Sequence, residues 1–191
     1  MINEPKIVEI TEIITETPTI KTFKFDWDFE TLGKPNPGEF LMIWNFNNEK
    51  PMSISQINDN ELAITVKNIG EFTSQLHDLQ VGDQIGVRGS YGNGFDNSFE
   101  GKKIIAIGGG VGMAPVNAIA SYLAPNNEVS VISAAQTKMN CCFWIHLKSQ
   151  GSVFTHALMM EVLDLKDLQQ IVLAICLKIQ LMIMHLSADL R

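Results

Sequence analysis

The chain has 191 residues, 46% of them hydrophobic and 18% charged, and its formal net charge at pH 7 is −7. This composition is typical of a globular protein, and the excess of acidic residues disfavours a nucleic-acid partner. The first ten residues mix polar and apolar side chains, no apolar run is long enough to cross a membrane uninterrupted, and there are three cysteines, so we expect a cytoplasmic protein without a membrane partner or a disulfide framework.

The first part of the chain, residues 6–95, is predicted to be a β domain made of short strands. Runs rich in β-branched and aromatic residues at 6–14, 19–25, 40–46 and 61–67 are separated by turns rich in proline, asparagine and glycine. Strands that are short and closely spaced favour an antiparallel barrel or sandwich over a parallel sheet.

A single helix is expected inside this domain, over residues 71–79. Phe72, Leu76 and Leu79 would share one face of that helix. The acidic segment 26–30 is predicted to be a solvated loop between two strands.

The pattern changes at residues 102–115, KKIIAIGGGVGMAP. Four apolar residues, 104–107, indicate a buried strand, and a glycine-rich turn is followed by a run with helical spacing. A strand, a glycine turn and a helix open a nucleotide-binding α/β unit, because glycines let backbone N–H groups approach a diphosphate near the positive end of the helix. The alternative is a tight turn that needs glycine for its backbone geometry alone.

A second strand is expected at residues 129–134. We therefore divide the chain into a β domain, 1–98, and an incomplete α/β nucleotide-binding domain, 99–191. The predicted fold class is a two-domain α+β and α/β protein, in which an antiparallel β-barrel precedes part of a Rossmann-like domain. No catalytic side chain and no metal-ligand spacing stands out.

This layout resembles the ferredoxin–NADP reductase superfamily, and three stretches support the resemblance. KPMSIS, residues 50–55, is similar to the flavin-binding strand, with lysine in place of the usual arginine. Lysine neutralises a phosphate but lacks the planar two-pronged donor of arginine. IGEFT, residues 69–73, is similar to the glycine turn at the FAD diphosphate, and RGSYGNGF, residues 88–95, is similar to the R-G-P-x-G-x-x-F segment that ends the barrel, with Ser90 in place of proline.

The phrases KPMSIS, VKNIGEFT, GNGF and IGGGVGMAP are together similar, in wording and order, to the electron transfer subunits of NAD-linked (class 1B) dihydroorotate dehydrogenase of pyrimidine biosynthesis. The resemblance covers about residues 5–137. It implies a six-stranded FAD-binding barrel, one [2Fe–2S] cluster, NAD as acceptor and a catalytic, FMN-bearing partner subunit in a heterotetramer. It also implies cofactor contacts for Lys50, Pro51, Met52, Ser53, Ile69, Gly70, Thr73, Gly108, Gly109, Gly110, Gly112, Met113, Ala114 and Pro115.

After Thr137 the chain departs from this family. A [2Fe–2S] cluster needs four ligands, whereas the chain has three cysteines. The family's C-G-P motif, which lies near the nicotinamide, is missing as well. Complete electron transfer by this sequence is therefore in question, and FAD binding is the property expected to survive.

The composition of the tail suggests a reason for the departure. Back-translation of residues 138–146, 156–171 and 185–191 with one shared offset allows an acidic helix, a glycine loop and C-G-P. We therefore hypothesise that the tail is partly a frameshift product. The alternative is a genuine tail with amphipathic helices in residues 157–184.

Two other functions are kept open by the sequence. One is a different reductase subunit of the same superfamily, of the hydrogenase or sulfide dehydrogenase type. The other is a cofactor-free structural module in which the glycines serve turns alone. The second predicts no stabilisation by a nucleotide, whereas bound FAD stabilises the folded state by mass action.

Overall fold

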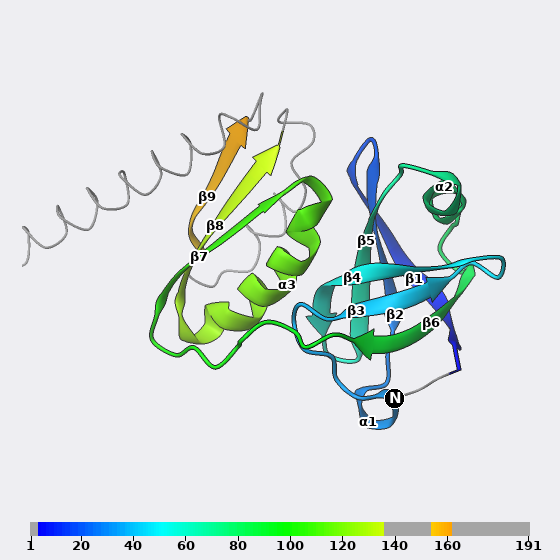
Figure 1. The fold of residues 1–191 in the computed structure, drawn as a ribbon, viewed down its shortest axis with the longest axis horizontal. Coiled ribbons are helices and arrows are strands. Elements are labelled where there is room, and N and C mark those ends of the chain that lie inside the picture. Colours follow the sequence, from blue (N-terminus) through cyan, green and yellow to red (C-terminus); the bar gives the residue numbers. More distant parts are fainter. Residues whose placement is uncertain (1–3, 136–153, 162–191) are drawn as a thin grey trace, which may run out of the picture.

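The computed structural model describes residues 4–135 and 154–161 (Figure 1). Six antiparallel strands close into a barrel in the order β1-β2-β5-β4-β3-β6. This confirms the predicted six-stranded barrel. The strands are β1 (Lys6–Thr17), β2 (Ile20–Asp26), β3 (Phe40–Trp44), β4 (Glu49–Asn58), β5 (Glu61–Lys67) and β6 (Gln84–Tyr91).

The barrel closes around side chains that alternate along its strands. Phe23 and Phe25 on β2, Leu41 on β3 and Ile64 on β5 are at most 1% exposed and belong to one hydrophobic cluster. Burial of each such side chain stabilises the fold by about 1.5–3 kcal/mol. The alternation places the neighbouring residues on the outer face, where polar side chains line up across the strands.

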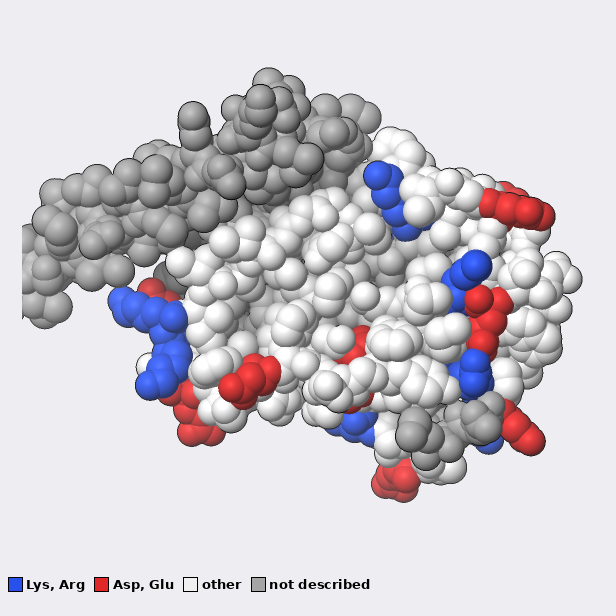
Figure 2. All heavy atoms as spheres, viewed as in Figure 1, with Lys and Arg blue, Asp and Glu red and all other residues white. Residues whose placement is uncertain are grey.

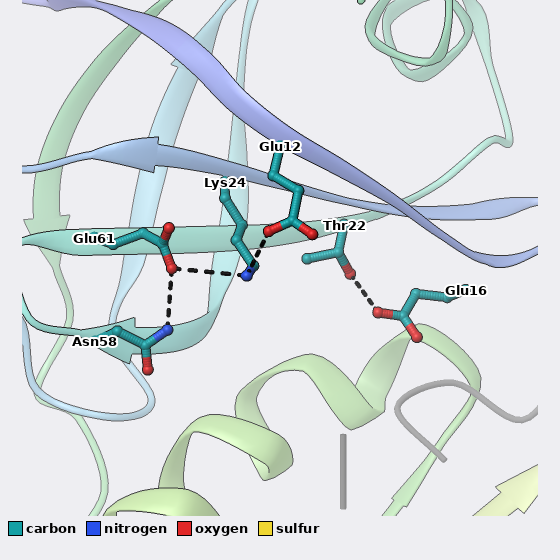
Figure 3. A network of polar contacts seen from close by, with 6 residues as sticks. All are labelled: Glu12, Glu16, Thr22, Lys24, Asn58 and Glu61. Atoms are coloured by element: carbon teal, nitrogen blue, oxygen red, sulfur yellow. Dashed lines mark hydrogen bonds and ion pairs between the residues drawn. The ribbon is translucent and has the colours of Figure 1, made fainter. Parts of the chain in front are cut away.

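On the outer face, Lys24 on β2 reaches both adjoining strands (Figure 3). Its Nζ lies 2.7 Å from Oε2 of Glu12 on β1 and 3.8 Å from Oε1 of Glu61 on β5. Glu61 also accepts a hydrogen bond of 3.1 Å from the amide of Asn58. Cross-strand pairs of opposite charge favour one strand register over its alternatives, although each exposed pair contributes little stability.

The segment predicted to be a loop contains a short helix, α1 (Phe29–Leu32), so the expectation of one helix in the β domain was wrong. Asp28 caps it, because its carboxylate accepts hydrogen bonds from the backbone N–H groups of Glu30 and Thr31 at 3.0 and 3.3 Å. Hydrogen bonding from Thr31 lowers the pKa of Asp28. The predicted second helix forms as α2 (Glu71–His77), two residues shorter than expected.

The second lobe is a parallel sheet in the order β7-β8-β9, with one helix on it. Its elements are β7 (Lys103–Gly109), a 3₁₀ turn (Gly110–Gly112), α3 (Met113–Leu123), a second 3₁₀ turn (Ala124–Asn126), β8 (Glu128–Ala135) and β9 (Phe154–Glu161). The predicted strand, glycine turn, helix and strand are all present. The helical alternative for the tail was wrong at 157–161, which belong to β9, and the rest of the tail and all three cysteines lie outside the described residues.

The two lobes pack directly on each other through α3, which lies against β4 (Figure 1). Ile20 of the barrel joins Met113, Ala114 and Ala120 of α3 in the second hydrophobic cluster. The predicted boundary between residues 98 and 99 falls in the segment that joins β6 to β7, and it stays a prediction. Among the described residues, no helix is both long and apolar enough to span a bilayer.

Candidate functional site

The predicted flavin strand is the first half of β4, and it is paired on one side only. Lys50 and Ser53 pair with β3 opposite Ile43 and Phe40, whereas the pairing of β4 with β5 begins at Ile54. The other edge of residues 50–53 therefore has no partner strand among the described residues. Pro51 lies in this segment, in keeping with the confinement of proline to sheet edges.

The exposure of these side chains matches that one-sided pairing. Lys50, Pro51 and Ser53 are exposed, and Met52 is half-buried against the barrel core. Side chains alternate along a strand, so the exposed Lys50 and Ser53 lie on opposite faces of β4, and Met52 packs against the barrel core.

The predicted diphosphate turn immediately precedes α2. Gly70 has extended backbone, with φ −169°, and a Cβ built on it would meet nothing within 4 Å. Neither backbone strain nor crowding by neighbours requires glycine at this position. Because Gly70 has no side chain, nothing at position 70 covers the first-turn N–H groups of α2. Those N–H groups have no intrahelical partners, and they carry the partial positive charge of the helix start.

The Thr73 hydroxyl, a predicted ligand contact, bonds to the backbone of its own turn in this structure. Its oxygen accepts hydrogen bonds of 3.0 Å from the N–H groups of Ile69 and Gly70, and it donates one of 2.9 Å to the Gly70 carbonyl. A hydroxyl has one donor and two acceptor positions, so Thr73 is fully engaged with the backbone. In this structure Thr73 shapes the turn, and two of the predicted amide donors are occupied by it.

The structure brings the flavin strand and the α2 turn to one end of the barrel. Asn45, which directly follows β3, donates a hydrogen bond of 2.5 Å to Gln75 of α2. β4 starts four residues later, at Glu49. Because β3 and β4 form a hairpin, this contact ties the start of β4 to α2.

The glycines of the second turn have distinct tasks. A Cβ on Gly108 would lie 2.7 Å from Sδ of Met113 and 3.1 Å from Cγ2 of Val116, so close packing of β7 on α3 requires glycine. Gly110 has φ +53°, a conformation that favours glycine. Gly112 has a φ of −63°, which any residue adopts, and a Cβ built on it would meet nothing within 4 Å. As at Gly70, the backbone at Gly112 is not covered by a side chain.

The remaining residues predicted in this turn mostly serve the core. The side chains of Met113 and Ala114 are buried in the second hydrophobic cluster, and the N–H of Met113 bonds to the carbonyls of Gly110 and Val111. Pro115 has no N–H to offer a ligand. The exposed backbone of Gly109 and Gly112 is therefore what this turn presents, and the turn contacts β5, the strand that leads into Gly70.

Charge is sparse on the face that joins the two lobes. Figure 2 shows this face largely uncharged between the barrel and the second lobe, with charged side chains around its rim. Beside Lys50, Glu49 accepts hydrogen bonds of 2.8 and 2.5 Å from Nε and Nη2 of Arg88. The hydrogen bond from Arg88 lowers the pKa of Glu49, so Glu49 is ionised and neutralised by Arg88 rather than by Lys50.

Sequence reasoning missed the residues that join the lobes. Asn117 on α3 is 1% exposed and donates a hydrogen bond of 2.8 Å to the Ser55 carbonyl. The sequence does contain a signal that could have identified Asn117: it is an asparagine, a poor helix former, among the alanines of an apolar helix. Gln56 is also buried, and neither atom of its amide has a hydrogen-bond partner in the described part of the chain, for which the structure offers no reason.

Comparison with known proteins gives sequence relatives that are named as electron transfer subunits. A probable electron transfer subunit of dihydroorotate dehydrogenase B (NAD(+)) from Methanothermobacter thermautotrophicus is 41% identical over 152 residues, 78% of this chain and 56% of the relative. The corresponding protein of Methanocaldococcus jannaschii is 40% identical over 142 residues, 73% of this chain and 51% of the relative. Over the matched residues, this chain is homologous to these electron transfer subunits. The chain spans about half the length of these relatives, and no protein-family model matches it.

Solved structures agree on the fold. A chain of the NADH-dependent reduced ferredoxin–NADP oxidoreductase superposes with a TM-score of 0.63 at 24% identity, covering 72% of this chain and 51% of that one. Ferredoxin–NADP⁺ reductase from Plasmodium falciparum gives a TM-score of 0.65 at 17% identity, covering 75% of this chain and 67% of that one. The predicted ferredoxin-reductase fold is confirmed.

Proposed function

We propose that this chain binds FAD across the open edge of β4 and the α2 turn, and that it transfers electrons to NAD as part of a dihydroorotate dehydrogenase. The observation that carries the proposal is the pair Gly70 and Gly112, which lack a side chain although neither backbone strain nor crowding demands it. Both glycines lie at helix starts in a chain that is homologous to electron transfer subunits. A ligand that approaches the backbone there explains both.

The residues present fit a flavin dinucleotide. Ser53 would hydrogen-bond the flavin ring from the open edge of β4, and Lys50 would neutralise a phosphate. The first-turn N–H groups of α2 beyond Gly70 would receive the diphosphate, and Thr73 would hold the turn in shape for it. The largely uncharged face between the lobes suits an apolar ring system (Figure 2). When bound, FAD supplies the redox chemistry, and the chain positions it.

The second turn would receive the other dinucleotide. The exposed backbone at Gly109 and Gly112 and the start of α3 favour the diphosphate of NAD. Gly108 contributes indirectly, because it lets β7 approach α3 closely. A close approach of strand and helix is also what the third glycine of dinucleotide-binding turns provides.

The partner in this proposal is a catalytic dihydroorotate dehydrogenase subunit that carries FMN, in a heterotetramer located in the cytoplasm. This assignment follows the names of the relatives and the resemblance of the motifs. A [2Fe–2S] cluster is not part of the proposal, because the chain has three cysteines where four thiolates are needed. Co-purification with a dihydroorotate-oxidising subunit would favour it over a hydrogenase or sulfide dehydrogenase partner.

The test is a titration of the purified chain with FAD, followed by flavin fluorescence and by the melting temperature. We expect saturable binding and a rise in melting temperature with FAD concentration, since a ligand of the folded state stabilises it by RT ln(1 + [L]/Kd). Lys50→Ala should weaken FAD binding about tenfold, the equivalent of one charge-assisted hydrogen bond.

The matched control is Lys103→Ala, which removes the same charge at the opposite end of β7 from the glycine turn. It should leave the affinity for FAD unchanged. A chain that neither binds FAD nor melts at a higher temperature in its presence contradicts the proposal and favours a cofactor-free module.

A further inference from the structure

The contact between the two lobes centres on an irregularity in β4. Ile54 pairs with Ile64 and Gln56 pairs with Ala63, so Ser55 is an extra residue in the ladder, a β-bulge. A bulged residue is left out of the strand pairing, and its backbone groups need other partners. Ser55 is fully buried, and its carbonyl accepts the hydrogen bond of 2.8 Å from Nδ2 of Asn117.

Asn117 is placed for this task by the helix. Ala114, Asn117 and Ala118 are buried and share one face of α3 at spacings of three and four residues. The two alanines are small, so the helix can approach β4 closely, and Asn117 supplies the polar group between them. In the described part of the chain, no other side chain of α3 forms a hydrogen bond with the barrel.

The bulge is braced from the barrel side as well. The hydroxyl of Ser55 contacts that of Thr65 at 2.9 Å, and Thr65 contacts Thr22 at 2.8 Å. Thr22 in turn bonds to Glu16 at 2.9 Å, as Figure 3 shows. This buried row of hydroxyls crosses β4, β5 and β2, so the Ser55 carbonyl is held in a fixed position.

We propose that Asn117 is a positioning residue that sets the geometry between the flavin strand and the dinucleotide turn. Ser53, the proposed flavin contact, lies two residues before Ser55 on β4, and Met113, which closes the glycine turn, lies one helical turn before Asn117 on α3. The hydrogen bond from Asn117 to Ser55 thus connects β4 and α3, the two elements that carry these proposed ligand contacts. The positioning role rests on the proposed function, whereas the contact itself does not.

The test replaces the donor with a titratable group. In Asn117→Asp at pH 8, a carboxylate faces the Ser55 carbonyl, and the buried carbonyl loses its donor. We expect hydrogen exchange in α3 and in β4 to be about ten- to a hundredfold faster than in the wild type, the equivalent of one buried unpaired carbonyl. At pH 5 the ratio should shrink, because burial raises the pKa of a carboxyl group and the protonated form donates again.

Two further variants separate this effect from a loss of packing. Asn117→Leu should show faster exchange at both pH values, since leucine cannot donate. Asn127→Asp is the matched control, because Asn127 is a buried asparagine that donates to the carbonyls of Phe99 and Leu123 and, within the described residues, has no bond to the barrel. Asn127→Asp should not change hydrogen exchange in β4. Glu16 is the titratable group that is joined to Ser55 through the hydroxyl row, and because all variants retain it, its titration does not distinguish them.

The positioning role needs a second readout on the FAD-loaded chain. Asn117→Asp at pH 8 should keep its FAD affinity within about twofold but lose the change in flavin absorption that NADH produces, and pH 5 should restore that change. An exchange ratio for Asn117→Asp that is equal at pH 5 and pH 8, or unaltered exchange in β4, overturns the proposal. If the wild type binds no FAD, the proposed function fails, whereas the exchange experiment still decides whether Asn117 joins the lobes.

Discussion

At the residue scale, the pair of Arg88 and Glu49 shows how this chain arranges charge near its candidate site. The side chains are each 25% exposed and meet through two hydrogen bonds, and Arg88 also lies 5.9 Å from the ring centroid of Tyr91. Two-pronged contacts of this kind hold both side chains in one orientation. The charge of Glu49 is thereby neutralised by Arg88.

This pair predicts a pH dependence of stability. The pKa of Glu49 is lower in the folded chain than its ordinary value of 4.5, so the pair stabilises the fold fully above pH 4.5 and loses its effect as the pH falls through the lowered pKa. Glu49→Gln should therefore be less stable than the wild type at pH 7, and the two should converge in strong acid. Urea unfolding at a series of pH values measures this; a constant difference down to the lowest pH would contradict it.

At the element scale, the turn between β7 and α3 combines a packing requirement with an open backbone. Gly108 lies under the side chains of Met113 and Val116, and Gly112 faces open space with helical backbone angles. Glycine therefore serves close packing at position 108 and leaves the backbone uncovered at position 112. A turn that needed glycine for geometry alone would not place one at Gly112.

Alanine at each position distinguishes these needs. Gly108→Ala should destabilise the chain by about 1–3 kcal/mol, because its methyl group would displace the buried Met113 side chain and crowd Val116. Gly112→Ala should leave stability unchanged or raise it by about 0.4–1 kcal/mol, since its conformation suits alanine. Chemical unfolding measures both, and isothermal titration with NADH should show weaker binding to Gly112→Ala. Equal stability losses in the two variants would refute this division of tasks.

At the scale of the whole molecule, the barrel is closed, whereas the parallel sheet is not. β7 has β8 on one edge and, among the described residues, no strand on the other. Ile105 and Ile107 on β7 are 44% and 48% exposed, and with Phe95 and Phe99 they line a cavity of about 430 Å³. Parallel strands are normally covered on both faces, so these exposed apolar side chains, together with the adjoining edge of β7, form a surface prone to association.

We expect the purified chain to associate as its concentration rises. Ile107→Glu should shift this association to higher concentration by about tenfold, since a charge on the edge opposes strand pairing and apolar contact. Val81→Glu is the control, because Val81 is 60% exposed and lies in the barrel loop before β6. Sedimentation velocity over a concentration series measures the effect. Equal effects of both variants would show that net charge, rather than this edge, controls association.

Much of the architecture could be predicted because it depends on local patterns of apolar residues and glycines in the sequence. Alternating apolar residues specify strands, and the barrel core at Phe23 and Phe25 follows that alternation. The glycine turn at 108–112 was recognisable because a strand precedes it and helical spacing follows. The short helix α1 was missed because four residues are too few to show a helical period, although Asp28 is a capping residue.

The amino-acid sequence by itself determined the barrel, the strand–turn–helix unit and the positions of both glycine turns, since each depends on neighbours within a few residues. Only the tertiary structure decided which glycine is needed for packing, that Thr73 is engaged with its own turn, and that Arg88 pairs with Glu49. It also decided that Asn117 meets Ser55, 62 residues away. Such pairings arise when a bulge and a helix face come together, and no local periodicity encodes where two separate elements touch.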